Sequence, residues 1–230
     1  MKNKPTFITF TGIDARTDLG KVQALSKKYP IEWGVLFGGS LSTPQRYPEP
    51  EVVRAALALE DVQFAAHLCG FYAKRAMGQG IVASELNMIL GSNRFARFQV
   101  NAGKYDMPSL LRLRDMLGKP IIFQARGKEF PPPLEPLPPL ADPLVFCRIP
   151  AVYSLHDLSG GKGKAPPFRP VQRPGIPIVG YAGGIGPDNV VQVISEIDAS
   201  LYWLDMETNV RTDDWLDLDK CEAVCKQVWE

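Results

Sequence analysis

The stretch from Pro177 to Ile197, PIVGYAGGIGPDNVVQVISEI, decides the fold class of this chain. It opens with β-branched and aromatic residues, continues with the paired glycines Gly183 and Gly184, and ends with apolar residues at helical spacing. A strand, a tight turn and a helix in this order form one βα unit of a parallel sheet. The pattern predicts a helix that starts at Pro187 and a turn whose backbone can approach an anion closely. A tight turn that binds no ligand is the alternative.

The same unit recurs along the whole chain. Short strand-like runs begin at Phe7, Trp33, Val62, Ala96, Pro120, Ala151, Pro177 and Leu201. Most of the gaps between them hold helical patterns, such as MPSLLRLRDMLG at 107–118, which Gly118 ends. Eight βα units predict a closed (β/α)8 barrel, formed as a single domain over residues 1–230. A doubly wound open sheet is the competing fold, but its glycine motif normally follows the first strand.

The segment after the fifth strand breaks this regularity. It reads PPPLEPLPPLADP, and its prolines remove the backbone N–H donors that a helix requires. We expect an extended proline-rich loop over Pro131–Pro139 in place of the fifth helix. A PxxP ligand for an aromatic groove of a partner protein is the alternative for this segment.

The charge balance argues against two classes of partner. Lys and Arg number 26 against 25 Asp and Glu, so the net charge is +1. Nucleic-acid and membrane-surface proteins need a basic excess on one face, so we expect neither nucleic acid nor membrane as partner. No run approaches the roughly 18 apolar residues of a membrane span, and the N-terminus lacks the pattern of a secretory signal.

The cysteines are few and scattered, at Cys69, Cys147, Cys221 and Cys225. This usage fits reduced thiols and predicts a cytoplasmic protein. Cys221 and Cys225 share one helical face with two valines, so core packing is favoured over metal binding. We expect no metal and no cofactor, and the oligomeric state stays open.

Three motifs in the second half of the chain agree in order and spacing with those of a known family. They are Leu155-His156-Asp157 followed by Gly160-Gly161-Lys162-Gly163, then Tyr181 through Val190, then Asp205-Met206-Glu207-Thr208-Asn209-Val210-Arg211. The chain here resembles the phosphoribosylanthranilate isomerases of tryptophan biosynthesis. Weaker similarity covers the first half, at Thr11-Gly12-Ile13, at Ser42 through Tyr47 and at Phe98 through Asn101.

The resemblance implies an Amadori rearrangement of a phosphorylated sugar derivative. This reaction needs a general acid at the ribose ring oxygen and a general base at the neighbouring carbon. By resemblance, Asp157 is the acid and Arg46 binds the substrate carboxylate, with Gln99 and Asn101 also at the substrate. The implied phosphate-binding residues are Gly183, Gly184, Asn189, Thr208 and Asn209.

Two positions depart from the family pattern. The catalytic cysteine of the first strand is replaced by Thr11, whose hydroxyl is no base near neutral pH. Asp14 is the best substitute base from the sequence, and a capping or solvated loop residue is its alternative role. Glu207 replaces a serine of the phosphate loop and brings a negative charge there, unless it points away or pairs with Arg211. His156 should face away from Asp157, because successive strand residues point to opposite sides.

Two functions remain in competition. The first is an isomerase-like enzyme, which the presence of Asp157 and Arg46 favours. The second is a catalytically silent barrel that binds a phosphorylated metabolite or a protein partner, which Thr11 favours. The expected ligand is a small phosphorylated metabolite, or, for the second function, a protein partner in its place.

Overall fold

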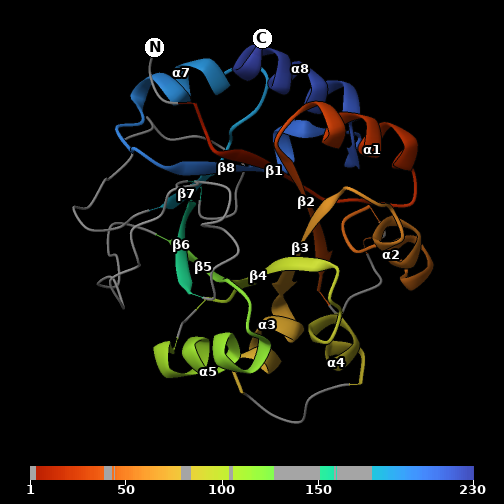
Figure 1. The fold of residues 1–230 in the computed structure, drawn as a ribbon, viewed down its shortest axis with the longest axis vertical. Helices are drawn as coiled ribbons and strands as arrows, with labels where there is room; N and C mark the ends of the chain where they lie inside the picture. Colours follow the sequence, from red (N-terminus) through yellow and green to blue (C-terminus); the bar gives the residue numbers. More distant parts are fainter. Residues whose placement is uncertain are drawn as a thin grey trace.

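The computed structural model describes residues 4–38, 43, 45–78, 84–103, 106–126, 151–157, 159 and 178–230. Within these residues eight parallel strands pair in chain order, and β8 returns to pair with β1, so the barrel closes (Figure 1). This confirms the predicted (β/α)8 barrel, and each predicted strand is present. The strands are β1 Phe7–Thr11, β2 Ile31–Phe37, β3 Gln63–Cys69, β4 Phe95–Asn101, β5 Ile121–Arg126, β6 Val152–Asp157, β7 Val179–Ala182 and β8 Tyr202–Met206.

The helices lie around the outside of the strands (Figure 1). They are α1 Leu19–Lys28, α2 Pro50–Leu57, α3 Gly70–Ala76, α4 Ser84–Leu90, α5 Met107–Leu117, α7 Val190–Glu196 and α8 Leu218–Trp229. After β8 come the 3-10 turn η1 Thr208–Val210 and two short antiparallel strands, β9 Arg211–Thr212 and β10 Trp215–Leu216. Gly118 ends α5 in the left-handed conformation, with φ of 58°, as its position in the sequence predicts.

The predicted start of the seventh helix at Pro187 is wrong, because α7 begins at Val190. Asn189 has φ of −139° and ψ of 0°, so its backbone is not helical. Its side-chain oxygen accepts a hydrogen bond from the Gly186 N–H at 2.9 Å, which closes a separate turn before the helix. An asparagine that bonds its own local backbone favours such a turn over a helix.

Two apolar clusters reflect the alternation of side chains along each strand. Ile8 and Phe10 pack under the helices in the larger cluster, whereas Phe7 belongs to a smaller one with Trp203 and Leu155. Leu155 also lines the cavity described below, so the smaller cluster occupies the barrel interior. It forms an apolar floor beneath the cavity.

A buried ion pair stands next to this floor. The Arg97 Nε and Nη2 atoms lie 2.7–2.9 Å from the Glu32 carboxylate, and Thr9 joins both residues by hydrogen bonds. The guanidinium lies 4.7 Å from the ring centres of Phe7 and Trp203. Since both charges are about 2% exposed, the pair is locked inside the barrel.

Several further expectations concern other parts of the chain. The proline-rich segment Pro131–Pro139 and the glycines Gly160, Gly161 and Gly163 lie outside the described residues. Cys221 and Cys225 are fully buried in the larger apolar cluster, which confirms their predicted core packing. Among the helices of the described ranges, none is both long and apolar enough to cross a membrane.

Candidate active site

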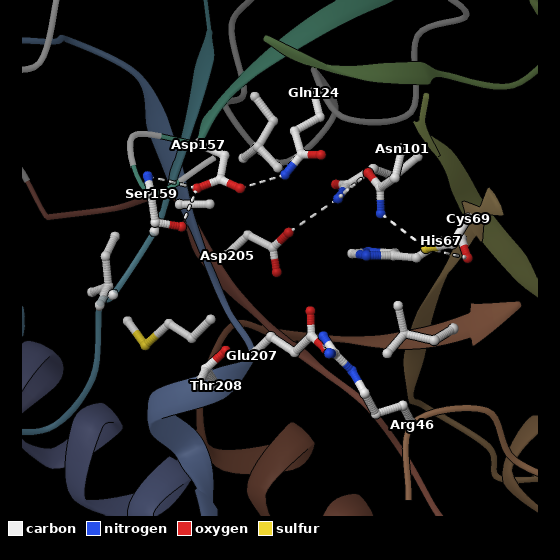
Figure 2. Close-up of a pocket in the computed structure, with 18 of the residues that line it drawn as sticks. Arg46, His67, Cys69, Asn101, Gln124, Asp157, Ser159, Asp205, Glu207 and Thr208 are labelled. Carbon is white, nitrogen blue, oxygen red and sulfur yellow. Dashed lines mark hydrogen bonds and ion pairs between the residues drawn. The ribbon is translucent and has the colours of Figure 1, made fainter. Parts of the chain in front are cut away.

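A cavity of about 280 Å³ lies at the carboxyl ends of the strands (Figure 2). In a (β/α)8 barrel this end carries the functional residues, because the βα loops meet there. The cavity brings together most of the residues that the sequence singled out: Arg46, Gln99, Asn101, Asp157, Gly183, Gly184 and Thr208. Those that do not line it are Thr11, Asp14, Asn189 and Asn209.

Asp157 ends β6 and is held from both sides. Its Oδ2 accepts a hydrogen bond from Gln124 Nε2 at 2.6 Å, and its Oδ1 accepts from the Ser159 N–H at 2.9 Å and hydroxyl at 2.7 Å (Figure 2). The carboxylate is 5% exposed and faces the cavity. Three donors fix its orientation, so a substrate atom meets a preorganised group.

A second carboxylate, Asp205 at the end of β8, faces the same space (Figure 2). Its Oδ1 accepts a hydrogen bond from the Thr11 hydroxyl at 2.7 Å, and its Oδ2 accepts from Gln99 Nε2 at 3.2 Å. Burial raises the pKa of Asp205 to about 6, although the Thr11 and Gln99 hydrogen bonds act to lower it. The negative charge of Asp157 also raises this pKa, so the two carboxylates interact.

Asp205 was missed as a site residue from the sequence, although the signal was present. It stands at the end of a predicted strand, as Asp157 does, and it opens the last of the three matched motifs. The Thr11 hydroxyl therefore orients a neighbouring carboxylate.

The structure does not bring Asp14 into the cavity. Its Oδ1 accepts from the Arg16 N–H and the Thr17 hydroxyl, and its Oδ2 accepts from the Leu216 N–H at 2.7 Å. With 1% exposure and Arg211 Nη1 at 3.9 Å, the carboxylate holds the β1 loop to β10. The alternative role from the sequence, a helix N-cap or a solvated loop residue, does not describe this geometry, because Asp18 caps α1 and Asp14 is buried.

Arg211 joins several loops at this end of the barrel. Its Nη1 donates to the carbonyl oxygens of Asp214 and Gln45, and its Nη2 donates to those of Gly12 and, at 3.5 Å, Thr11. Gly12 has φ of 117°, and a Cβ there would lie 1.6 Å from Arg211 Nη2. Only a glycine leaves room for the guanidinium at this point.

The predicted phosphate turn divides into two kinds of residue. Gly183 and Gly184, with φ of 105° and 67°, and Thr208 lie at the cavity. Asn189 and Asn209 instead donate their side-chain N–H groups to the Gly184 carbonyl, at 2.9 and 2.8 Å. The two asparagines thus shape the turn from behind.

Arg46 and Glu207 form an ion pair across the cavity mouth (Figure 2). Arg46 comes from the loop after β2 and Glu207 directly follows β8, and both line the cavity. The structure thus pairs Glu207 with Arg46, whereas the sequence suggested Arg211. The guanidinium predicted to bind a substrate carboxylate is already neutralised by a carboxylate of the chain itself.

His67 on β3 is a further cavity residue that the sequence analysis missed. Burial lowers its pKa to about 4, so the imidazole is neutral. The alternation in VQFAAHL does not reveal which strand face is internal, so no sequence signal marked this histidine.

His156, in contrast, is buried beside Tyr181 and does not line the cavity, as predicted. In the described ranges, no three His, Cys, Asp or Glu side chains are grouped to hold a metal ion.

Comparisons with known proteins define the class of fold. No family model matches the chain, and no curated protein matches it by sequence. Among solved structures, phosphoribosylanthranilate isomerase from Pyrococcus furiosus matches with a TM-score of 0.56 and 18% identity, over 96% of this chain and 98% of that one. The corresponding enzyme from Thermococcus kodakaraensis gives 0.57 and 14%, over 97% and 99%.

Another solved barrel is equally similar. A mutant form of the tryptophan synthase α-subunit of Pyrococcus furiosus has a TM-score of 0.57 and 12% identity, over 97% of this chain and 98% of that one. At such identities the likeness shows the fold alone. The chain is a TIM barrel, and its chemistry has to be argued from its own cavity.

Proposed function

We propose that this barrel catalyses an acid/base isomerisation of a phosphorylated sugar derivative, as a divergent relative of the phosphoribosylanthranilate isomerases. The main observation in support of this reaction is the pair of buried carboxylates, Asp157 on β6 and Asp205 on β8, which face the same cavity. An aldose-to-ketose rearrangement needs one group that gives a proton and one that takes it. The phosphoribosylanthranilate isomerases among the structural neighbours share this barrel fold, and the motifs around Asp157 and Asp205 resemble theirs.

The two carboxylates have different surroundings, which suits a division of roles. We assign Asp157 the acid role that the resemblance gives it, toward the sugar ring oxygen. Asp205 then takes the proton from the adjacent carbon, since its pKa near 6 leaves it mostly ionised yet basic at neutral pH. Thr11 holds Asp205 in place by its hydrogen bond. The missing cysteine is thus replaced by the neighbouring strand's carboxylate.

The phosphate end of the substrate is assigned to the turn after β7. Gly183 and Gly184 bring backbone to the cavity wall, and Thr208 adds a hydroxyl from the loop after β8. The substitution Gly184→Asp adds a negative charge there, so it should abolish binding of inorganic phosphate. Loss of amide chemical-shift changes on phosphate titration, with a native-like spectrum otherwise, is the expected result. Equal phosphate affinity of both forms would remove this assignment.

The central experiment measures turnover of phosphoribosylanthranilate by the native chain and by Asp157→Asn and Asp205→Asn. Each substitution should reduce kcat by about 10²–10⁴-fold, the usual value of general acid or base catalysis. Asp115→Asn on the exposed side of α5 is the matched control and should leave the rate unchanged. Unchanged turnover in either cavity variant would contradict the assigned role.

A second function has its own supporting observation. Arg46 already forms an ion pair with Glu207. The carboxylate of an anthranilate-like substrate would therefore meet a guanidinium whose charge is neutralised. This favours a catalytically silent barrel that binds a phosphorylated metabolite or a protein partner. Phosphate binding together with no turnover in the native chain would establish this second function over the first.

A further inference from the structure

Two buried polar atoms in the cavity wall have no hydrogen-bond partner within the described ranges. They are Nε2 of His67 and Oε1 of Gln99, on side chains that are 1% and 2% exposed. The two residues stand opposite each other in the β3–β4 register, and both line the cavity. Figure 2 shows the His67 ring directed from β3 into the cavity. Buried polar groups are nearly always paired, so these two atoms mark a place for a ligand.

The orientation of the Gln99 amide decides what it can bind. Its Nε2 donates to Asp205 Oδ2 and to Asn101 Oδ1, both at 3.2 Å, which assigns the remaining Oε1 as the unpartnered end. A carbonyl oxygen only accepts hydrogen bonds. The ligand group at this point must therefore carry a hydrogen, as a hydroxyl or an N–H does.

His67 adds the second requirement. Burial keeps its imidazole neutral, with a pKa lowered to about 4, although the charges of Glu32 and Glu207 act to raise it. In a neutral imidazole one nitrogen donates and the other accepts, so Nε2 alone is either a donor or an acceptor, and the ring offers no positive charge to an anion. Its neighbour Gly34 keeps the space open, because a Cβ there would lie 3.0 Å from His67 Nε2 and 2.5 Å from Thr11 Oγ1.

We propose that His67 and Gln99 form a subsite for an uncharged hydroxyl group of the substrate. The hydroxyl donates its hydrogen to Gln99 Oε1, and its oxygen accepts a hydrogen bond from the Nε2–H of His67. A carboxylate or fully ionised phosphate is excluded, since neither has a hydrogen for Gln99. The assignment of this hydroxyl to a sugar rests on the proposed function. The requirement for an uncharged hydrogen-bond donor rests only on the two unpartnered atoms.

The test uses the native chain, which has only two histidines. With ¹⁵N-labelled histidine, the imidazole signals are followed by NMR during titration with D-ribose, with ribose 5-phosphate and with inorganic phosphate. Both sugars should shift the His67 signal and leave that of His156 in place, and phosphate alone should move neither. If millimolar ribose and ribose 5-phosphate leave His67 unmoved, or if phosphate alone shifts it, the subsite assignment is overturned.

Variants then separate the subsite from the reaction. His67→Phe should weaken ribose binding about tenfold, which corresponds to one net hydrogen bond, and His67→Gln should restore part of it. His156→Phe is the matched control, because it removes the other buried histidine outside the cavity. Equal ribose affinity in His67→Phe would contradict the proposal. A shifted His67 signal without turnover of phosphoribosylanthranilate would overturn the proposed reaction and leave the hydroxyl subsite standing.

Discussion

Thr11 donates its hydroxyl hydrogen to Asp205 Oδ1 at 2.7 Å. A residue of the first barrel strand, β1, thus orients a carboxylate of the last strand, β8. A hydrogen bond to the ionised form favours that form, and this one lowers the pKa of Asp205 against the effect of burial. The Thr11 hydroxyl thus favours the ionised form of the neighbouring carboxylate.

Removing this hydrogen bond should make Asp205 harder to ionise. We expect the pKa of Asp205 in Thr11→Val to rise above its native value of about 6. The titration of the Asp205 carboxyl carbon, followed by ¹³C NMR, measures this directly, and the acid limb of any kcat/KM profile should move to higher pH with it. Thr17→Val is the matched control, since it removes a threonine hydrogen bond to Asp14, outside the cavity. An unmoved Asp205 titration would refute the coupling.

The ionised, buried carboxylate of Asp205 should destabilise the folded state near neutral pH. Its pKa is about 6 in the folded chain, against an ordinary value of 3.8 for an aspartate. Between these values the folded state binds more protons, so the free energy of unfolding falls as pH rises. Asp205→Asn removes this loss and should stabilise the chain at neutral pH by up to about 3 kcal/mol.

Urea unfolding of the native chain and Asp205→Asn across the acid range checks this prediction. The comparison isolates Asp205, because His67, with its lowered pKa, gives the opposite slope in both proteins. The gain should vanish below the unfolded pKa of Asp205. A variant that is less stable than the native chain at neutral pH would show that the ionised carboxylate is well accommodated.

Glu207 should restrict the binding of anions. Glu207→Gln leaves Arg46 without its carboxylate partner and free to pair with an anionic ligand. We expect phosphate affinity to rise by about tenfold, as one favourable charge contact allows. Calorimetric titration measures this, and Glu51→Gln, which breaks the exposed pair with Arg54 on α2, should change nothing. Equal affinity for the native chain and Glu207→Gln would show that Arg46 takes no part in anion binding.

The buried pair under the cavity should make a large contribution to stability. Arg97→Met leaves Glu32 charged and unpaired inside the barrel, which typically costs about 3–5 kcal/mol. Replacing both residues by methionine should recover most of this loss. Denaturant midpoints measure the effect, with Lys226→Met in the partly exposed pair with Glu222 as a control that is expected to lose far less stability. A cost for Arg97→Met as small as that of the control would disprove the interpretation.

The sequence predicted the barrel well because strand and helix periodicity are local properties. Each strand run, the stop at Gly118 and the cavity position of Asp157 follow from residues close together in the chain. The ion pair of Arg46 with Glu207 depends on two loops separated by 161 positions, and no local pattern contains it. The burial of Asp14 against Arg211 is likewise a long-range property. The local sequence does not reveal it, so Asp14 alone looks like a candidate base.

The place of Arg211 in the chain has a consequence for the order in which the molecule is completed. Its guanidinium binds carbonyl groups at positions 11, 12 and 45, yet it is itself synthesised 166 positions after the last of these three. The loops after β1 and β2 therefore lack the Arg211 guanidinium until all eight barrel strands have left the ribosome. The contacts that join these loops at the cavity end of the barrel therefore form late in biosynthesis. A nascent chain that ends before residue 211 cannot make them.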